Sequence, residues 1–226
     1  MTITTKADWL SCSDLDALLD FLDGKVSDRK FHLFASACLR RAMHVLPRQY
    51  GANVIEVTER FADGLATPEE LAAAWSSAEL DARVAAGFTP RLLAGVDASV
   101  AADAIAWAAA RRAAWRSTGE MDPAAWQDVF DARWTAAWEE AWTREREQQI
   151  LLLHDIVGNP FRKPRPATTW PSEVVEVARA FYHGLPCRHE LVKALERIGA
   201  TYYAQHFDDG VHPKGCWVLD LILHRS

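Results

Sequence analysis

The sequence predicts an all-α protein, a multi-helix bundle with two long antiparallel helices and a smaller C-terminal helical unit. Apolar residues recur at intervals of three and four along most of the chain, as in helices with one buried face. Glycines, prolines and capping residues separate these segments. An alanine-rich stretch also alternates small with very large side chains, a pattern typical of closely packed helices, at Trp107, Trp115, Trp126, Trp134, Trp138 and Trp142.

Two helices are expected before Pro47. Leucines at helical spacing predict the first over residues 15–22, capped by Ser13 and ended by Gly24. The second starts with the charged group Asp28-Arg29-Lys30 and continues until Pro47, which lacks the N–H that a helix interior needs. That charged group is interpreted as a partner for the helix dipole beside a solvated face.

The next segment contains the clearest helix start in the chain. A helix over roughly residues 54–63 closes at Gly64. Residues 67–70, Thr-Pro-Glu-Glu, then combine a capping threonine, a proline at the first helical position and a glutamate three residues after the cap. This capping box predicts another helix that runs toward Gly87.

Two long helices follow, joined by a short turn. The first covers about residues 90–117, with Gly95 as a candidate interruption, and the second covers about residues 123–157 and ends at Gly158. Because the turn between them is short, they are expected to pack antiparallel.

Residues 158–171 contain four prolines and are interpreted as a connector. They separate a helical bundle at residues 1–157 from a C-terminal helical unit at residues 172–226, which we expect to pack on the bundle. The final apolar run is compatible with a strand or a helix, and the lack of a hairpin signal favours a helix. The helices expected in this unit cover residues 172–182, residues 188–198, a short segment near residue 201, and residues 216–223.

Composition narrows the class of protein. The formal net charge is −6 and the pI is about 5.7, which disfavours a nucleic-acid partner because such binding needs clustered Lys and Arg. No apolar run is long enough to span a membrane, and the start of the chain does not resemble a secretory signal. The four scattered cysteines predict no disulfide scaffold. We therefore expect a cytoplasmic protein.

The tryptophans provide a candidate interface. Successive positions four residues apart drift by about 40° around a helix, so Trp134, Trp138 and Trp142 form a ridge with Trp126 on the same side. An exposed ridge could bind a partner, whereas a buried one would be a seam against the alanine-rich helix before it. Nearby glutamates disfavour a platform for nucleic-acid bases, so the seam is the favoured interpretation.

The C-terminal region gathers residues that suit zinc. Cys187, His206, His212 and Cys216 could close a tetrahedral site, and His189 lies close to Cys187 in the sequence. Their spacing matches no familiar zinc motif, and buried cysteines with surface histidines are the favoured alternative. Arg162, Lys163 and Arg165 in the connector form a second candidate, an anion site, against the simpler reading of exposed linker charges.

No motif in the sequence indicates catalysis. The chain lacks the Glu-x-x-His pairs of di-metal helical bundles, a Gly-x-Ser-x-Gly nucleophile turn and the glycine-rich phosphate loops. The leading hypothesis is therefore a non-catalytic cytoplasmic interaction or scaffold module with a protein partner or self-association, and without a cofactor. The alternative is a small metal-dependent or ligand-binding protein that uses the C-terminal His and Cys residues, with zinc as the cofactor.

Three stretches carry a resemblance. They are Trp9-Leu10 with residues 24–30 (Gly-Lys-Val-Ser-Asp-Arg-Lys), residues 158–162 (Gly-Asn-Pro-Phe-Arg), and residues 212–221 (His-Pro-Lys-Gly-Cys-Trp-Val-Leu-Asp-Leu). Together they resemble an uncharacterised bacterial, planctomycete-type protein family with a variable Ala/Trp-rich helical middle. Such sequences often have cysteines where this chain has Ser36 and Phe207. The resemblance implies no activity, substrate or catalytic residue.

Overall fold

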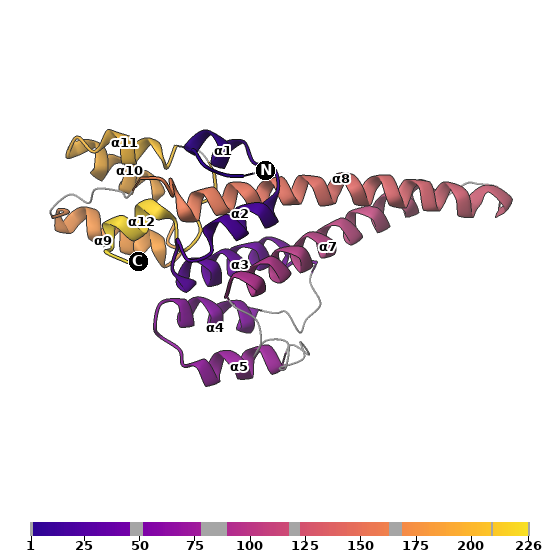
Figure 1. The fold of residues 1–226 in the computed structure, drawn as a ribbon, viewed down its shortest axis with the longest axis horizontal. Helices are drawn as coiled ribbons and strands as arrows, with labels where there is room; N and C mark the ends of the chain where they lie inside the picture. The colour runs from indigo at the N-terminus through magenta and orange to yellow at the C-terminus, as the bar shows by residue number, and fades with distance from the viewer. Residues whose placement is uncertain are drawn as a thin grey trace.

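The structure, a computed structural model, describes residues 2–45, 52–77, 90–117, 123–162, 169–208 and 210–225. These residues form helices and no strand, which confirms the predicted fold class (Figure 1). No described helix has a stretch both long and apolar enough to cross a membrane. The helices are α1 (Lys6–Ser11), α2 (Leu15–Leu22), α3 (Asp28–Ala42), α4 (Ala52–Ala62), α5 (Pro68–Ser77), α7 (Pro90–Ser117), α8 (Pro123–Val157), α9 (Ser172–Tyr182), α10 (Arg188–Arg197), α11 (Thr201–Gln205) and α12 (Trp217–Ile222).

The N-terminal caps differ from the prediction. The sequence analysis missed α1, whose capping box pairs Thr5 with Asp8. Hydrogen bonds from Thr4 and Thr5 lower the pKa of the exposed Asp8 carboxyl to about 2. Asp14, and not Ser13, caps α2. Its carboxylate accepts hydrogen bonds from the backbone N–H groups of Asp16 and Ala17.

The capping box predicted at residues 67–70 is confirmed. The backbone N–H of Thr67 donates to the Glu70 carboxylate at 2.8 Å, and the backbone N–H of Glu70 donates to the Thr67 hydroxyl at 3.2 Å. The expected continuation of this helix to Gly87 lies outside the described residues, as does the expected end of the second helix at Pro47. Within the described residues, α3 ends at Ala42.

Helices α7 and α8 lie antiparallel, as predicted, and project from the body of the molecule as an arm (Figure 1). Gly95 does not interrupt α7, which continues through it. One face of α7 packs against its neighbours through alanines that are fully buried, at Ala94, Ala98, Ala101, Ala102, Ala106, Ala110 and Ala114. Small side chains let the two backbones approach closely, which allows the long pairing.

Two large hydrophobic clusters organise the body. The first joins α1 and α2 to α3 and to the body-side parts of α7 and α8, and Trp9, Leu18 and Cys38 are fully buried in it. The second joins α9 to α12 around Leu191, Phe207 and other buried side chains. A smaller cluster attaches α4 and α5 to α3. The last apolar run forms helix α12, so the choice of helix over strand was correct.

Candidate metal centre and adjoining cavity

Four side chains converge where the end of α8 meets the C-terminal helices. They are Asp155 of α8, His206 directly after α11, and His212 and Cys216 before α12, and their candidate ligand atoms all lie within 4.8 Å of one another. Asp155 Oδ1 lies 2.8 Å from His212 Nδ1 and 2.9 Å from His206 Nε2. His206 Nε2 also lies 3.1 Å from Cys216 Sγ.

The cluster contains three of the four residues that the sequence analysis grouped. Cys187 does not join it, because it lies at the start of α10, where its thiol contacts the carbonyl of Val177 at 3.6 Å. His189 is exposed on α10. The fourth member is instead Asp155, which sequence reasoning missed. One signal was present: an acidic residue in the last turn of a helix is unfavourable beside the helix dipole, so Asp155 needed a positively charged or metal partner.

The contacts of His206 argue against a nucleophilic Cys-His-Asp arrangement. Such a relay uses both ring nitrogens of the histidine, one facing the thiol and the other facing the carboxylate. Here the same atom, Nε2, faces both Cys216 Sγ and Asp155 Oδ1. A ring nitrogen carries at most one proton, so it cannot satisfy both contacts by donating. The cluster is therefore not arranged as a nucleophilic relay.

The separations fit a small tetrahedral ion. Zinc bonds of about 2.0–2.3 Å place neighbouring ligand atoms about 3.3–3.6 Å apart. Three of the separations, 2.8, 2.9 and 3.1 Å, are shorter than this by a few tenths of an ångström, and the others reach up to 4.8 Å, so a bound ion would draw some ligand atoms together and move others apart. Asp155 Oδ2 is buried without a hydrogen-bond partner, which leaves one oxygen of the site unsatisfied.

Two groups of the cluster have shifted pKa values. Burial alone would raise the pKa of Asp155, but the contacts with His206 and His212 outweigh it and lower that pKa. Burial and the neighbouring Asp155 raise the pKa of the Cys216 thiol well above its ordinary value. A thiol of this kind is a poor nucleophile unless a cation stabilises the thiolate.

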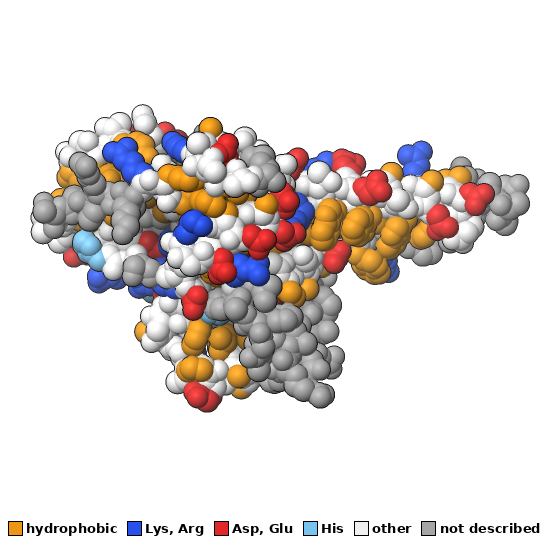
Figure 2. Space-filling model, viewed as in Figure 1, with side chains coloured by type: hydrophobic (Ala, Val, Ile, Leu, Met, Phe, Trp, Pro, Cys, Tyr) orange, Lys and Arg blue, Asp and Glu red, His pale blue; other side chains and the backbone are white. Residues whose placement is uncertain are grey.

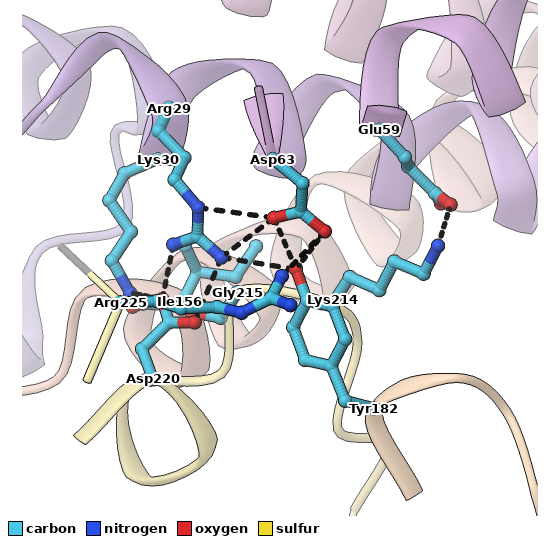
Figure 3. A network of polar contacts seen from close by, with 10 residues as sticks. All are labelled: Arg29, Lys30, Glu59, Asp63, Ile156, Tyr182, Lys214, Gly215, Asp220 and Arg225. Atoms are coloured by element: carbon cyan, nitrogen blue, oxygen red, sulfur yellow. Dashed lines mark hydrogen bonds and ion pairs between the residues drawn. The ribbon is translucent and has the colours of Figure 1, made fainter. Parts of the chain in front are cut away.

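Lys30 holds the backbone next to two of the candidate ligands. Its ammonium group donates to the carbonyl of Ile156 at 2.7 Å, to the carbonyl of Gly215 at 2.7 Å and to Asp220 at 2.6 Å. Figure 3 draws Lys30 with Ile156 and Gly215. Ile156 follows Asp155 and Gly215 precedes Cys216, so one side chain of α3 positions the backbone beside both candidate ligands. Three acceptors satisfy all three donors of an ammonium group, which makes Lys30 a positioning residue.

Arg29 extends this polar network. It donates to Asp220 at 2.6 and 2.9 Å, to Asp63 at 3.2 and 3.3 Å and to the hydroxyl of Tyr182 at 3.0 Å (Figure 3). The side chains of Arg29 and Lys30 are only 11% and 13% exposed, so the predicted solvated face at the start of α3 was wrong. A run of charged residues usually faces water, and the carboxylates that pair with these two come from distant parts of the chain.

Two glycines allow the close contacts behind the cluster. Gly158 and Gly215 have positive φ values of 72° and 88°. A Cβ at Gly158 would lie 2.8 Å from Cγ of Trp217, and one at Gly215 would lie 2.8 Å from Cδ1 of Leu33. The indole of Trp9 also donates to the carbonyl of Gly158 at 3.1 Å. The three stretches that carry the resemblance therefore meet around the candidate metal centre.

A cavity of about 810 Å³ adjoins the cluster. Asp155, His206 and His212 line it, while Cys216 lies behind them and is fully buried. The other walls come from α1, Arg41 of α3, the end of α8 and the residues after it, α11, the segment before α12, and Trp217 of α12. Its size is in the range of small-molecule sites.

The predicted tryptophan ridge is partly exposed. Trp134, Trp138 and Trp142 are half-buried, and Trp107 of α7 is 51% exposed. The rings of Trp138 and Trp142 stack at 5.2 Å, while Trp107 meets Trp134 edge-on at 5.9 Å. Figure 2 shows hydrophobic side chains gathered on the projecting part of α7 and α8. The side chains of Trp115 and Trp126 lie outside the described part of the structure.

Comparison with protein-family models, curated proteins and solved structures found no match to this chain. The resemblance to planctomycete-type proteins therefore stays a prediction, and the site must be interpreted from its own geometry.

Proposed function

We propose that this protein binds a zinc ion through Asp155, His206, His212 and Cys216, and that the ion forms one wall of a ligand-binding cavity. The observation that carries the proposal is the convergence of one carboxylate oxygen, two imidazole nitrogens and one thiol within 4.8 Å. It corresponds to the alternative hypothesis from the sequence, with Asp155 in place of Cys187.

The donor set favours zinc over the hard cations. Ca²⁺ and Mg²⁺ prefer shells of oxygen ligands, whereas imidazole and thiolate suit Zn²⁺ and its neighbours in the transition series. Four protein donors fill a tetrahedral shell, which is the pattern of a structural ion. The ion would hold the end of α8 against the segments that flank α11 and α12. A reducing compartment keeps such a thiol available, so we expect the protein to act in the cytoplasm.

Metal analysis tests this proposal directly. The full chain, incubated with Zn²⁺ and dialysed, should retain about one equivalent of zinc by elemental analysis, and Co²⁺ should give the absorption of a tetrahedral thiolate complex. Cys216→Ser should weaken zinc binding about 10-fold or more and remove the thiolate-to-cobalt band. Cys187→Ser and His189→Gln are matched controls outside the cluster and should bind as the wild type does. A folded wild-type chain that retains no zinc would contradict the proposal.

A second candidate function is self-association through the arm, and the exposed indole of Trp107 favours it. Large aromatic side chains contribute strongly to interfaces when they become buried. Sedimentation at increasing concentration should show a dimer that Trp107→Gln weakens, whereas Tyr202→Gln, at a more exposed aromatic away from the arm, should leave it unchanged. A wild-type chain that stays monomeric at every concentration would exclude this candidate.

A further inference from the structure

We infer that the cavity beside the metal centre binds a small organic anion with an apolar body, such as an aromatic carboxylate or phosphate ester. This inference goes beyond the zinc proposal, because the cationic and apolar walls that carry it are not metal ligands.

The charges around the cavity are mostly positive. Lys6, Arg41 and Arg162 line it, and Asp155 is its one carboxylate among the described residues. Arg41 is paired with Glu145, but neither Lys6 nor Arg162 forms an ion pair with a described residue. The whole chain carries a formal charge of −6, so this local excess of cations stands out from the rest of the surface. Two cations that line one cavity and have no ion-pair partner among the described residues attract an anion.

Much of the remaining wall is apolar and unusually exposed, beside polar side chains such as Gln148 and Asn159. Large hydrophobic side chains on a surface normally stand singly, whereas four of them border this one cavity. Leu10 is 55% exposed, Leu151 is 59% exposed, and Tyr202 and Val211 are each 69% exposed. The indoles of Trp9 and Trp217 add aromatic surface. An apolar ligand body would cover these side chains, so an inorganic ion alone would leave most of the wall unused.

The two kinds of wall together define the ligand. Its acidic group would lie near Lys6 and Arg162, and its aromatic or aliphatic body would lie on Leu151 and the indoles. One of the three cationic connector residues from the sequence analysis, Arg162, thereby takes part in the anion site considered there. Lys163 and Arg165 lie outside the described residues.

Calorimetry with matched probes tests the inference on the full chain, with zinc and after chelation. Benzoate and phenyl phosphate should each bind about 10-fold more tightly than neutral benzamide, and more tightly than acetate or inorganic phosphate. Lys6→Gln and Arg162→Gln should each weaken benzoate binding about 3-fold to 10-fold, as expected for one lost charge contact. Lys193→Gln and Arg133→Gln, exposed cations elsewhere, are the matched controls.

A charge pair at one position gives a second measurement. Leu151 is exposed, so Leu151→Glu and Leu151→Lys should both fold, and benzoate should bind the lysine variant about 5-fold or more tightly than the glutamate variant. Equal binding of benzoate and benzamide, no binding of any anion, or unchanged binding by Lys6→Gln and Arg162→Gln would overturn the inference. Because binding is measured with and without zinc, a failure of the metal proposal is seen separately.

Discussion

Single residues near the candidate metal centre are constrained by contacts from distant parts of the chain. Lys30 of α3 bonds to backbone on both sides of the cluster, and Gly158 has no room for a side chain against Trp217. The sequence already suggested a helix stop at Gly158, but the close approach of an indole ring adds a second reason for glycine at that position. Backbone conformation and packing therefore both act on one residue.

A comparison of Gly158→Ala with Gly199→Ala should separate the effect of backbone conformation from that of packing. Gly158→Ala imposes both a left-handed conformation on alanine and a clash with Trp217, so we expect a loss of about 2–4 kcal/mol in the free energy of unfolding. Gly199→Ala is the matched control, because its φ is also 72° and a Cβ there would meet nothing within 4 Å. It should cost only about 1–2 kcal/mol. Urea denaturation measures both, and equal losses would show that Trp217 adjusts without cost.

At the scale of elements, the long helices illustrate how periodicity and side-chain size act together. The buried alanines of α7 set the distance to α8, while the larger tryptophans lie beside the seam and are left half-buried. The prediction of a core seam was thus correct for the alanines and only in part for the tryptophans. A long helix pair that leaves the body has too few neighbours to cover every indole.

Ala106→Leu tests the seam. Ala106 is fully buried in α7, so three extra carbon atoms should force the helices apart and destabilise the protein by about 1–3 kcal/mol. Ala132→Leu, at an exposed position of α8, should change stability by less than about 0.5 kcal/mol. Thermal and urea unfolding measure both variants. A harmless Ala106→Leu would mean that α7 and α8 are less closely packed than described.

At the scale of the whole molecule, buried ion pairs connect the N-terminal helices to the C-terminal ones. Arg29 of α3 pairs with Asp220 of α12 and with Asp63, and Asp63 also pairs with Arg225. Burial would raise the pKa of Asp63, but the contacts with Tyr182 and Arg225 outweigh it and lower that pKa. A buried network of this kind stabilises the docked arrangement only while its carboxylates stay ionised.

The protein should therefore lose stability in acid. An ordinary Asp has a pKa near 3.8, and Asp63 has a lower one when folded. Its contribution is complete above pH 3.8 and disappears as the pH falls through the folded pKa. Asp97 has the opposite effect, because burial raises its pKa in the folded state. Its contribution to the free energy of unfolding therefore decreases as the pH rises.

Asp63→Asn tests the contribution of the Asp63 ion pairs to stability separately from that of Asp97. We expect it to be less stable than the wild type by about 1–3 kcal/mol at neutral pH, because the charge that pairs with Arg29 and Arg225 is lost. The difference should shrink as the pH falls below 3.8 and Asp63 becomes protonated in the wild type. Urea midpoints measured across this range provide the test. A difference that stays constant with pH would contradict it.

Most of the helices could be predicted from the sequence, because periodicity, caps and breakers act over a few residues. The capping box at residues 67–70, the start of α7 at Pro90 and the span of α8 are examples. The short α1 was missed, because a helix of six residues leaves little periodicity to detect. Three of the candidate ligands were found because His206, His212 and Cys216 lie close in the sequence.

What the sequence determined by itself was the all-α class, the long antiparallel pair and the position of most helix ends. These depend on local hydrogen bonding and on which face of a helix is apolar. Only the tertiary structure decided that Asp155 replaces Cys187 in the cluster, that Arg29 and Lys30 are buried, and that a cavity opens beside the cluster. Asp155 is about fifty residues from His206, and Lys30 is 185 residues from Gly215. Such contacts form when α3, α8 and the segment before α12 dock, which no local pattern specifies.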